Sequence, residues 1–80
     1  MGKKSEPKMD IFLKQLGAHI AAVRKEQKYS QDKVYLESGF GRGTMSKIER
    51  GIVNPQIWTL EIIAKTIGVP LAKLVTFRRK

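Results

Sequence analysis

A short stretch of the chain, SGFGRGTMSKIERG at residues 38–51, places three glycines at alternate positions just before a basic segment. Glycine-rich loops can hold the phosphates of a nucleotide, but only at defined spacings. A Walker loop requires a lysine directly after its last glycine, and lysine follows none of Gly39, Gly41 and Gly43. A dinucleotide-binding loop requires a preceding strand and a glycine at the position of Thr44. The stretch is therefore not predicted to bind a nucleotide cofactor.

The other reactive residue types also argue against an enzyme. The 80-residue chain contains no cysteine, which excludes disulfides and thiolate metal sites. Its single histidine, His19, has no cysteine or second histidine with which to share a metal ion, and we expect it on the surface. A domain of this size buries only roughly 60% of its unfolded surface, which disfavours a deep cleft. We expect no catalytic residues, no metal and no cofactor.

The net charge indicates the kind of partner. Lys and Arg number 16 against 7 Asp and Glu, which gives a net charge of +9. This excess favours a polyanion, either nucleic acid or an anionic membrane surface, and its alternative is plain solubility. No stretch approaches the roughly 18 apolar residues of a membrane span, and the N-terminus lacks an apolar run. The chain is expected to be soluble and cytoplasmic.

The apolar pattern of the first half of the chain predicts two helices after a polar arm. Residues 1–9 are polar and basic, so we expect a flexible N-terminal arm. Residues 10–26 form the first predicted helix. Its apolar residues recur at helical spacing and are Phe12, Leu13, Leu16, Ile20 and Val23. Ser30 is a suitable N-cap for a second helix over residues 31–38, and Gly39 can end it in the left-handed conformation.

Three further helices are predicted in the second half. The third begins three residues after the preceding cap, with Gly41 at its start, and a fourth ends at Gly68. The apolar face of the fourth helix comprises Ile57, Leu60, Ile63, Ala64 and Ile67. Leu71 and Leu74 predict a last short helix, and a basic tail follows at residues 78–80. The sequence thus predicts an all-α domain of five helices over residues 10–77.

Half of the chain resembles a known family. The segment SQDKVYLESGFGRGTMSKIERGIVNPQIWTLEIIAKTIGV, residues 30–69, is similar to the Cro and phage-repressor type of helix-turn-helix proteins, also called the Xre type. The combination of SKIERG, NP and TLEIIAKTIGV is fairly specific for it. The resemblance implies a compact five-helix bundle in which the second and third helices form a central helix-turn-helix. It also implies a packed ion pair between Arg24 and Glu49.

The third helix carries the candidate DNA contacts. A helical wheel places Met45 and Ile48 on one side and a polar arc on the other. The residues of this polar arc, together with the adjacent Thr44, are predicted to contact DNA. They are Arg42, Gly43, Thr44, Ser46, Lys47 and Arg50. Arg42 and Lys47 can donate to guanine O6 and N7, whereas Arg50 is expected at the DNA backbone. The resemblance implies that Gln31 holds a phosphate, and the alternative is an ordinary exposed side chain.

Two residues depart from the family pattern. Tyr35 stands where alanine is usual between the two helices, so its bulk must be accommodated near Gly39 or by a tilt of the helices. Gly43 stands where a base-reading side chain is common, which leaves direct readout mainly to Arg42 and Lys47.

Apolar residues outside the core pattern predict a dimer contact. Trp58 and Ile62 lie four residues apart on the side of their helix away from the core, and Val75 and Phe77 lie nearby in sequence. The family usually reads pseudo-palindromes as two-fold dimers, so we expect a homodimer. In the alternative arrangement, the C-terminal tail folds back over Trp58 and Ile62.

The resemblance implies a transcriptional regulator, most often a repressor, that binds double-stranded DNA sequence-specifically and occludes a promoter. A second candidate is an antitoxin or controller-type module whose main partner is a toxin protein and which binds DNA for autoregulation. Co-purification of a second polypeptide distinguishes the two.

Overall fold

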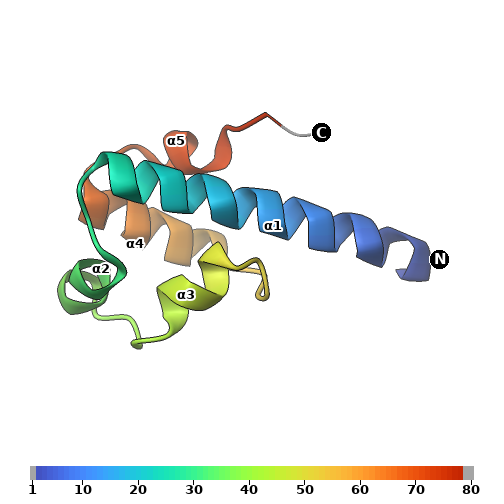
Figure 1. The fold of residues 1–80 in the computed structure, drawn as a ribbon, viewed down its shortest axis with the longest axis horizontal. Helices are drawn as coiled ribbons and strands as arrows, with labels where there is room; N and C mark the ends of the chain where they lie inside the picture. Colours follow the sequence, from blue (N-terminus) through green and yellow to red (C-terminus); the bar gives the residue numbers. More distant parts are fainter. Residues whose placement is uncertain (1, 79–80) are drawn as a thin grey trace.

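Five helices account for the regular structure of residues 2–78. The computed structural model describes residues 2–78, with side chains from Lys8 onward. Its helices are α1 (Gly2–Glu26), α2 (Gln31–Ser38), α3 (Thr44–Glu49), α4 (Ile57–Ile67) and α5 (Leu71–Val75). Figure 1 shows the long α1 with α5 above it and with α2 and α3 below it. Residues 2–78 contain no strand, so the predicted all-α fold is confirmed. None of these helices is both long and apolar enough to cross a membrane.

Local sequence signals set the ends of α2 and α4. The Ser30 Oγ accepts a hydrogen bond from the Lys33 backbone N–H at 3.0 Å, as an N-cap side chain does. Gly39 and Gly68 follow the last turns of α2 and α4 with φ angles of 85° and 84°. Glycine adopts this left-handed conformation without steric cost. These three predicted helix ends are confirmed.

The third helix begins later than predicted. Its first residue is Thr44 and its N-cap is Gly43, whereas the sequence pattern placed the cap at Gly41. The Thr44 backbone N–H donates to the Gly41 carbonyl at 3.1 Å, which closes a tight turn before the first helical turn. Two glycines within three residues disfavour a helix at this point, so the chain forms a turn before α3 begins.

The first helix begins earlier than predicted. It starts at Gly2 instead of near Asp10, and Figure 1 shows its N-terminal end projecting beyond the other helices. The segment contains Lys and Glu, which are good helix formers, and also Pro7, which disfavours a helix interior. The flexibility of residues 1–9 stays a prediction. Met1 of this arm, and Arg79 and Lys80 of the predicted basic tail, lie outside the described residues.

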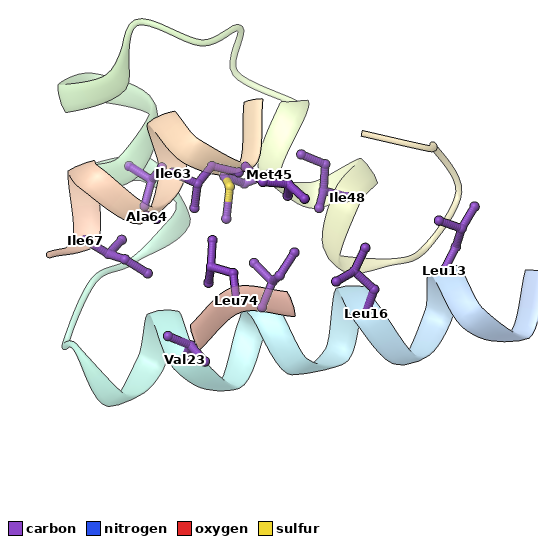
Figure 2. Close-up of a cluster of buried hydrophobic side chains, with 12 residues drawn as sticks. Leu13, Leu16, Val23, Met45, Ile48, Ile63, Ala64, Ile67 and Leu74 are labelled. Carbon is purple, nitrogen blue, oxygen red and sulfur yellow. The ribbon is translucent and has the colours of Figure 1, made fainter. Parts of the chain in front are cut away.

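Apolar side chains from all five helices meet in one core. Figure 2 shows side chains of α1 directed toward those of α3, α4 and α5. The buried apolar residues are Leu13, Leu16, Ile20, Val23, Val34, Met45, Ile48, Leu60, Ile63, Ala64, Ile67 and Leu74. Because α3 and α5 span only six and five residues, burial in this core must stabilise them.

Two residues of the predicted apolar faces lie outside this core. Ile57 is 62% exposed, because it is the first residue of α4 and lies beyond the end of the buried cluster. Phe12 is half-buried, and its ring centroid lies 5.8 Å from that of Phe77. The other residues predicted on the apolar faces of α1 and α4 are buried.

The backbones of α1 and α3 approach each other at Gly17. A Cβ atom on Gly17 would lie 2.6 Å from the Glu49 carbonyl oxygen and would overlap the Ile48 carbonyl. Just beyond α3, a Cβ atom on Gly51 would lie 2.6 Å from the Lys14 Cα. Both glycines are needed, because any side chain there would push α3 away from α1. Gly17 was not identified from the sequence, although an isolated glycine inside a helical pattern can indicate such a close contact.

Gly17→Ala is expected to lower the free energy of unfolding by about 2 kcal/mol. The added methyl group overlaps the backbone of α3 at a cost of up to about 3 kcal/mol, and replacement of a helical glycine returns about 1 kcal/mol. Urea denaturation measures the difference.

Gly43→Ala is the matched control for this substitution. A Cβ atom at Gly43 meets nothing within 4 Å, and φ there is −87°. Its free energy of unfolding should change by less than about 1 kcal/mol. Equal stabilities of the two variants would contradict the close contact at Gly17.

Candidate nucleic-acid interface

The predicted helix-turn-helix consists of α2, a glycine-containing turn and α3. Met45 and Ile48 of α3 are 2% and 3% exposed and belong to the core, as predicted. The remaining surface of α3 and of the turn before it carries the predicted DNA contacts, which we call the basic arc. The basic arc comprises the exposed Arg42, Gly43, Lys47 and Arg50 and the half-buried Thr44 and Ser46. The structure therefore brings these six residues together on one short helix and the residues that flank it.

The basic side chains of the arc are held in different ways. The Arg42 guanidinium lies over the Tyr35 ring of α2, with its central carbon 5.1 Å from the ring centroid. The Arg50 Nε donates to the Ser46 carbonyl at 3.4 Å, a long hydrogen bond. Lys47 is exposed in the last turn of α3, where a positive charge is favourable for the helix dipole. Their exposed N–H groups offer donors and positive charge, which suits an anionic ligand.

Gln31 has a partner within the motif. It is the first residue of α2 and is half-buried, and its side-chain Nε2 donates to the Glu49 Oε1 at 2.8 Å. The sequence predicted a phosphate contact for this side chain, with an exposed residue as the alternative. The structure instead directs the amide toward the end of α3, although Nε2 carries a second N–H.

The predicted ion pair between Arg24 and Glu49 is confirmed. The Arg24 Nε donates to Glu49 Oε2 at 2.6 Å, and Nη2 donates to Oε1 at 2.9 Å. Nη1 donates to the Tyr29 carbonyl at 2.7 Å. The hydrogen bonds and negative charge of Glu49 raise the pKa of Arg24, against the opposing effect of its burial. Both side chains are less than a tenth exposed, so the pair is protected from solvent.

The four predicted dimer residues differ in their exposure. Trp58 is 65% exposed and Val75 is 42% exposed, whereas Ile62 is half-buried. Phe77 packs on α1, where its ring centroid lies 5.4 Å from that of His19. The described part of the tail therefore leaves Trp58 largely uncovered, contrary to the arrangement in which the tail folds over it. Ile57, next to Trp58, adds exposed apolar surface, although the helical pattern predicted it on the buried face of α4.

His19 of α1 contacts the backbone of α5. It is half-buried, and its Nε2 donates to the Lys73 carbonyl of α5 at 2.7 Å. The expectation of a plain surface residue was therefore incomplete. No group of three His, Asp or Glu side chains within the described residues could hold a metal ion.

Comparison with known proteins identifies the same motif. The model of a family described as helix-turn-helix matches residues 20–74. An uncharacterized HTH-type transcriptional regulator of Sinorhizobium fredii is 38% identical over 63 residues, which are 79% of this chain and 82% of the relative.

Two phage proteins are also similar to the chain. The immunity repressor protein of Bacillus phage phi105 is 33% identical over 60 residues, 75% of this chain and 42% of the relative. The transcriptional repressor RstR of cryptic phage CTXphi, from Vibrio cholerae, is 37% identical over 57 residues, 71% of this chain and 51% of the relative. The chain thus spans about half the length of these two relatives. No solved structure matches it significantly.

Glu49→Gln is expected to lower the free energy of unfolding by about 3 kcal/mol. The substitution leaves the Arg24 charge buried without its counter-ion, and the loss of one partner of a buried pair typically costs roughly 3–5 kcal/mol. Thermal and chemical denaturation at neutral pH measure the effect.

Glu26→Gln is the control, because it removes the same charge from an exposed pair. Glu26 lies 3.8 Å from the Lys73 Nζ, and both side chains are about half exposed. Such a pair contributes less than about 1 kcal/mol. A Glu49→Gln protein as stable as the Glu26→Gln protein would show that the buried pair does not hold α3.

Proposed function

We propose that the chain, which belongs to the Cro and phage-repressor (Xre) type of helix-turn-helix proteins, is a repressor that inserts α3 into the major groove of double-stranded DNA. As a member of this family, it is a DNA-binding regulator of transcription. One observation carries the proposal. Met45 and Ile48 fix α3 to the core and leave the basic arc outside. A recognition helix must present its polar side in this way to reach base edges.

The basic arc supplies two kinds of DNA contact. Arg42 and Lys47 donate to guanine O6 and N7, and Thr44 and Ser46 reach a base edge or a phosphate. Arg50, at the C-terminal end of α3, contacts the DNA backbone. Gly43 carries no side chain, so the backbone can approach the groove closely.

Gln31 contributes a phosphate contact of a different kind. Its side chain is bonded to Glu49, so the free backbone N–H groups at the start of α2, together with the second amide N–H, bind the phosphate. The bond to Glu49 keeps this donor group at a fixed position relative to α3.

Two copies bind one operator. A single recognition helix covers only a few base pairs, and two-fold dimers place two such helices about 34 Å apart. Trp58 and Ile62 of α4 form the contact between the copies, since Trp58 exposes most of its apolar side chain. Val75, which is also exposed, extends this contact, whereas Phe77 packs on α1 of its own copy. A dimer bound across a promoter represses transcription by excluding the polymerase.

Arg42→Ala and Lys47→Ala are each expected to weaken operator binding by about 1 to 3 kcal/mol. Arg50→Ala should chiefly lower the slope of log affinity against log salt concentration by about one unit, because it removes one phosphate contact. Fluorescence anisotropy with an operator selected from genomic fragments measures both quantities.

Lys73→Ala is the control for loss of charge. Lys73 is exposed on α5, on the opposite side of α1 from α3 in Figure 1. Its operator affinity should remain close to that of the unchanged protein. If Arg42→Ala and Lys47→Ala bind as Lys73→Ala does, the assignment of the basic arc is wrong.

Trp58→Ala combined with Ile62→Ser is expected to convert the dimer to monomer, since both changes remove apolar area from the proposed contact. Sedimentation velocity measures the change. Leu36→Ala is the control, because Leu36 is 75% exposed but lies on α2. A dimer that survives the double substitution would exclude this interface.

A further inference from the structure

Tyr35 and Arg42 form a contact between α2 and the turn that leads into α3. The 5.1 Å separation between the guanidinium carbon and the ring centroid is within the range of cation–π attraction. Tyr35 is half-buried on α2, whose two ends are fixed by the Ser30 and Gly39 caps. Arg42 is exposed. The ring is therefore the fixed partner, and the guanidinium is the group that needs to be held.

The backbone around Arg42 provides little restraint of its own. Arg42 lies between two glycines and before the first residue of α3. Space around these glycines is open, since a Cβ on Gly43 meets nothing within 4 Å and one on Gly41 meets only the Thr44 hydroxyl, at 3.7 Å. An arginine in such a turn has many side-chain rotamers, and ordering it on binding carries an entropic cost. A contact that orders it beforehand reduces this cost.

A cation–π contact of this kind can leave the arginine able to read a base. A guanidinium over an aromatic ring uses its flat face, while its N–H donors point outward in its own plane. Guanine O6 and N7 accept two parallel hydrogen bonds of this kind. Two residues are proposed to read guanine. Lys47 has a single rotatable ammonium group, so only Arg42 can select guanine through the geometry of a planar fork of donors.

We propose that Tyr35 is a positioning residue that holds Arg42 over its ring for bidentate recognition of one guanine in each half-site. This inference rests on the proposed function. Tyr35 acts through Arg42 and needs no contact with DNA. The ring, rather than the phenolic hydroxyl, provides the effect.

The test measures guanine selectivity rather than overall affinity. Each guanine of the selected operator is replaced in turn by 7-deazaguanine, which lacks the N7 acceptor. The position at which the unchanged protein loses affinity and Arg42→Ala does not identifies the guanine read by Arg42. Tyr35→Phe should retain this loss in full. Tyr35→Leu should lower the affinity for the unmodified operator by about 2- to 5-fold, the size expected for loss of an exposed cation–π contact. It should also make the affinity loss caused by 7-deazaguanine at this position smaller by about the same factor.

A double-substitution cycle separates positioning from a structural role. Adding Tyr35→Leu to Arg42→Ala should change operator affinity by less than 2-fold (a bound of about 0.4 kcal/mol), since no guanidinium is left to position. A purely structural role would instead weaken binding equally in both backgrounds and leave the 7-deazaguanine pattern unchanged. Tyr35→Ala repeats the measurement if Tyr35→Leu fails to give a cooperative thermal transition.

Two negative results have different meanings. If the unchanged protein shows no preference for any selected DNA, the proposed function fails and this inference fails with it. If the protein binds its operator selectively, but Tyr35→Leu keeps the full dependence on the guanine read by Arg42, only the positioning role of Tyr35 is overturned.

Discussion

The carboxylate of Glu49 joins three helices, and the orientation of α3 depends on it. Arg24 of α1 donates two hydrogen bonds to this carboxylate, and Gln31 of α2 donates a third. Six residues cannot form a stable helix alone, so α3 takes its direction from such contacts and from the core. A buried ion pair adds little net stability compared with apolar packing, but its bonds are directional. Glu49 therefore contributes geometry where Met45 and Ile48 contribute stability.

Two glycines make this arrangement possible. Without side chains at Gly17 and Gly51, the backbone of α1 lies directly against the end of α3 and the residue that follows it. The short distance brings the buried Arg24 within reach of Glu49. The exposed glycines of the helix-turn-helix have the opposite role, since Gly39 ends α2 and Gly43 leaves space in front of the backbone. The same residue type thus allows close packing inside and close approach by a ligand outside.

The two proposed contacts lie on different helices: the DNA contact on α3 and the dimer contact on α4. The basic arc on α3 carries the charge that suits DNA, and α4 begins with the exposed apolar Ile57 and Trp58. A rigid connection between the two helices matters for a dimer, because the spacing of the recognition helices must match the DNA repeat. Ile48 of α3 and Ile63 of α4 belong to the same buried core, which links the two helices.

The sequence by itself determined the features that depend on neighbours along the chain. Helical periodicity identified most of the core residues of α1, α3 and α4, and Ser30, Gly39 and Gly68 marked helix ends, because caps and periodicity act within a few residues. Family resemblance added the Arg24–Glu49 pair. Only the tertiary structure decided that Gln31 bonds Glu49, that Arg42 lies over Tyr35, that Phe77 packs on α1 and that Ile57 lies outside the core. Each of these depends on where separate helices, or the ends of helices, come to lie in space, and the local pattern of residues does not encode those distances.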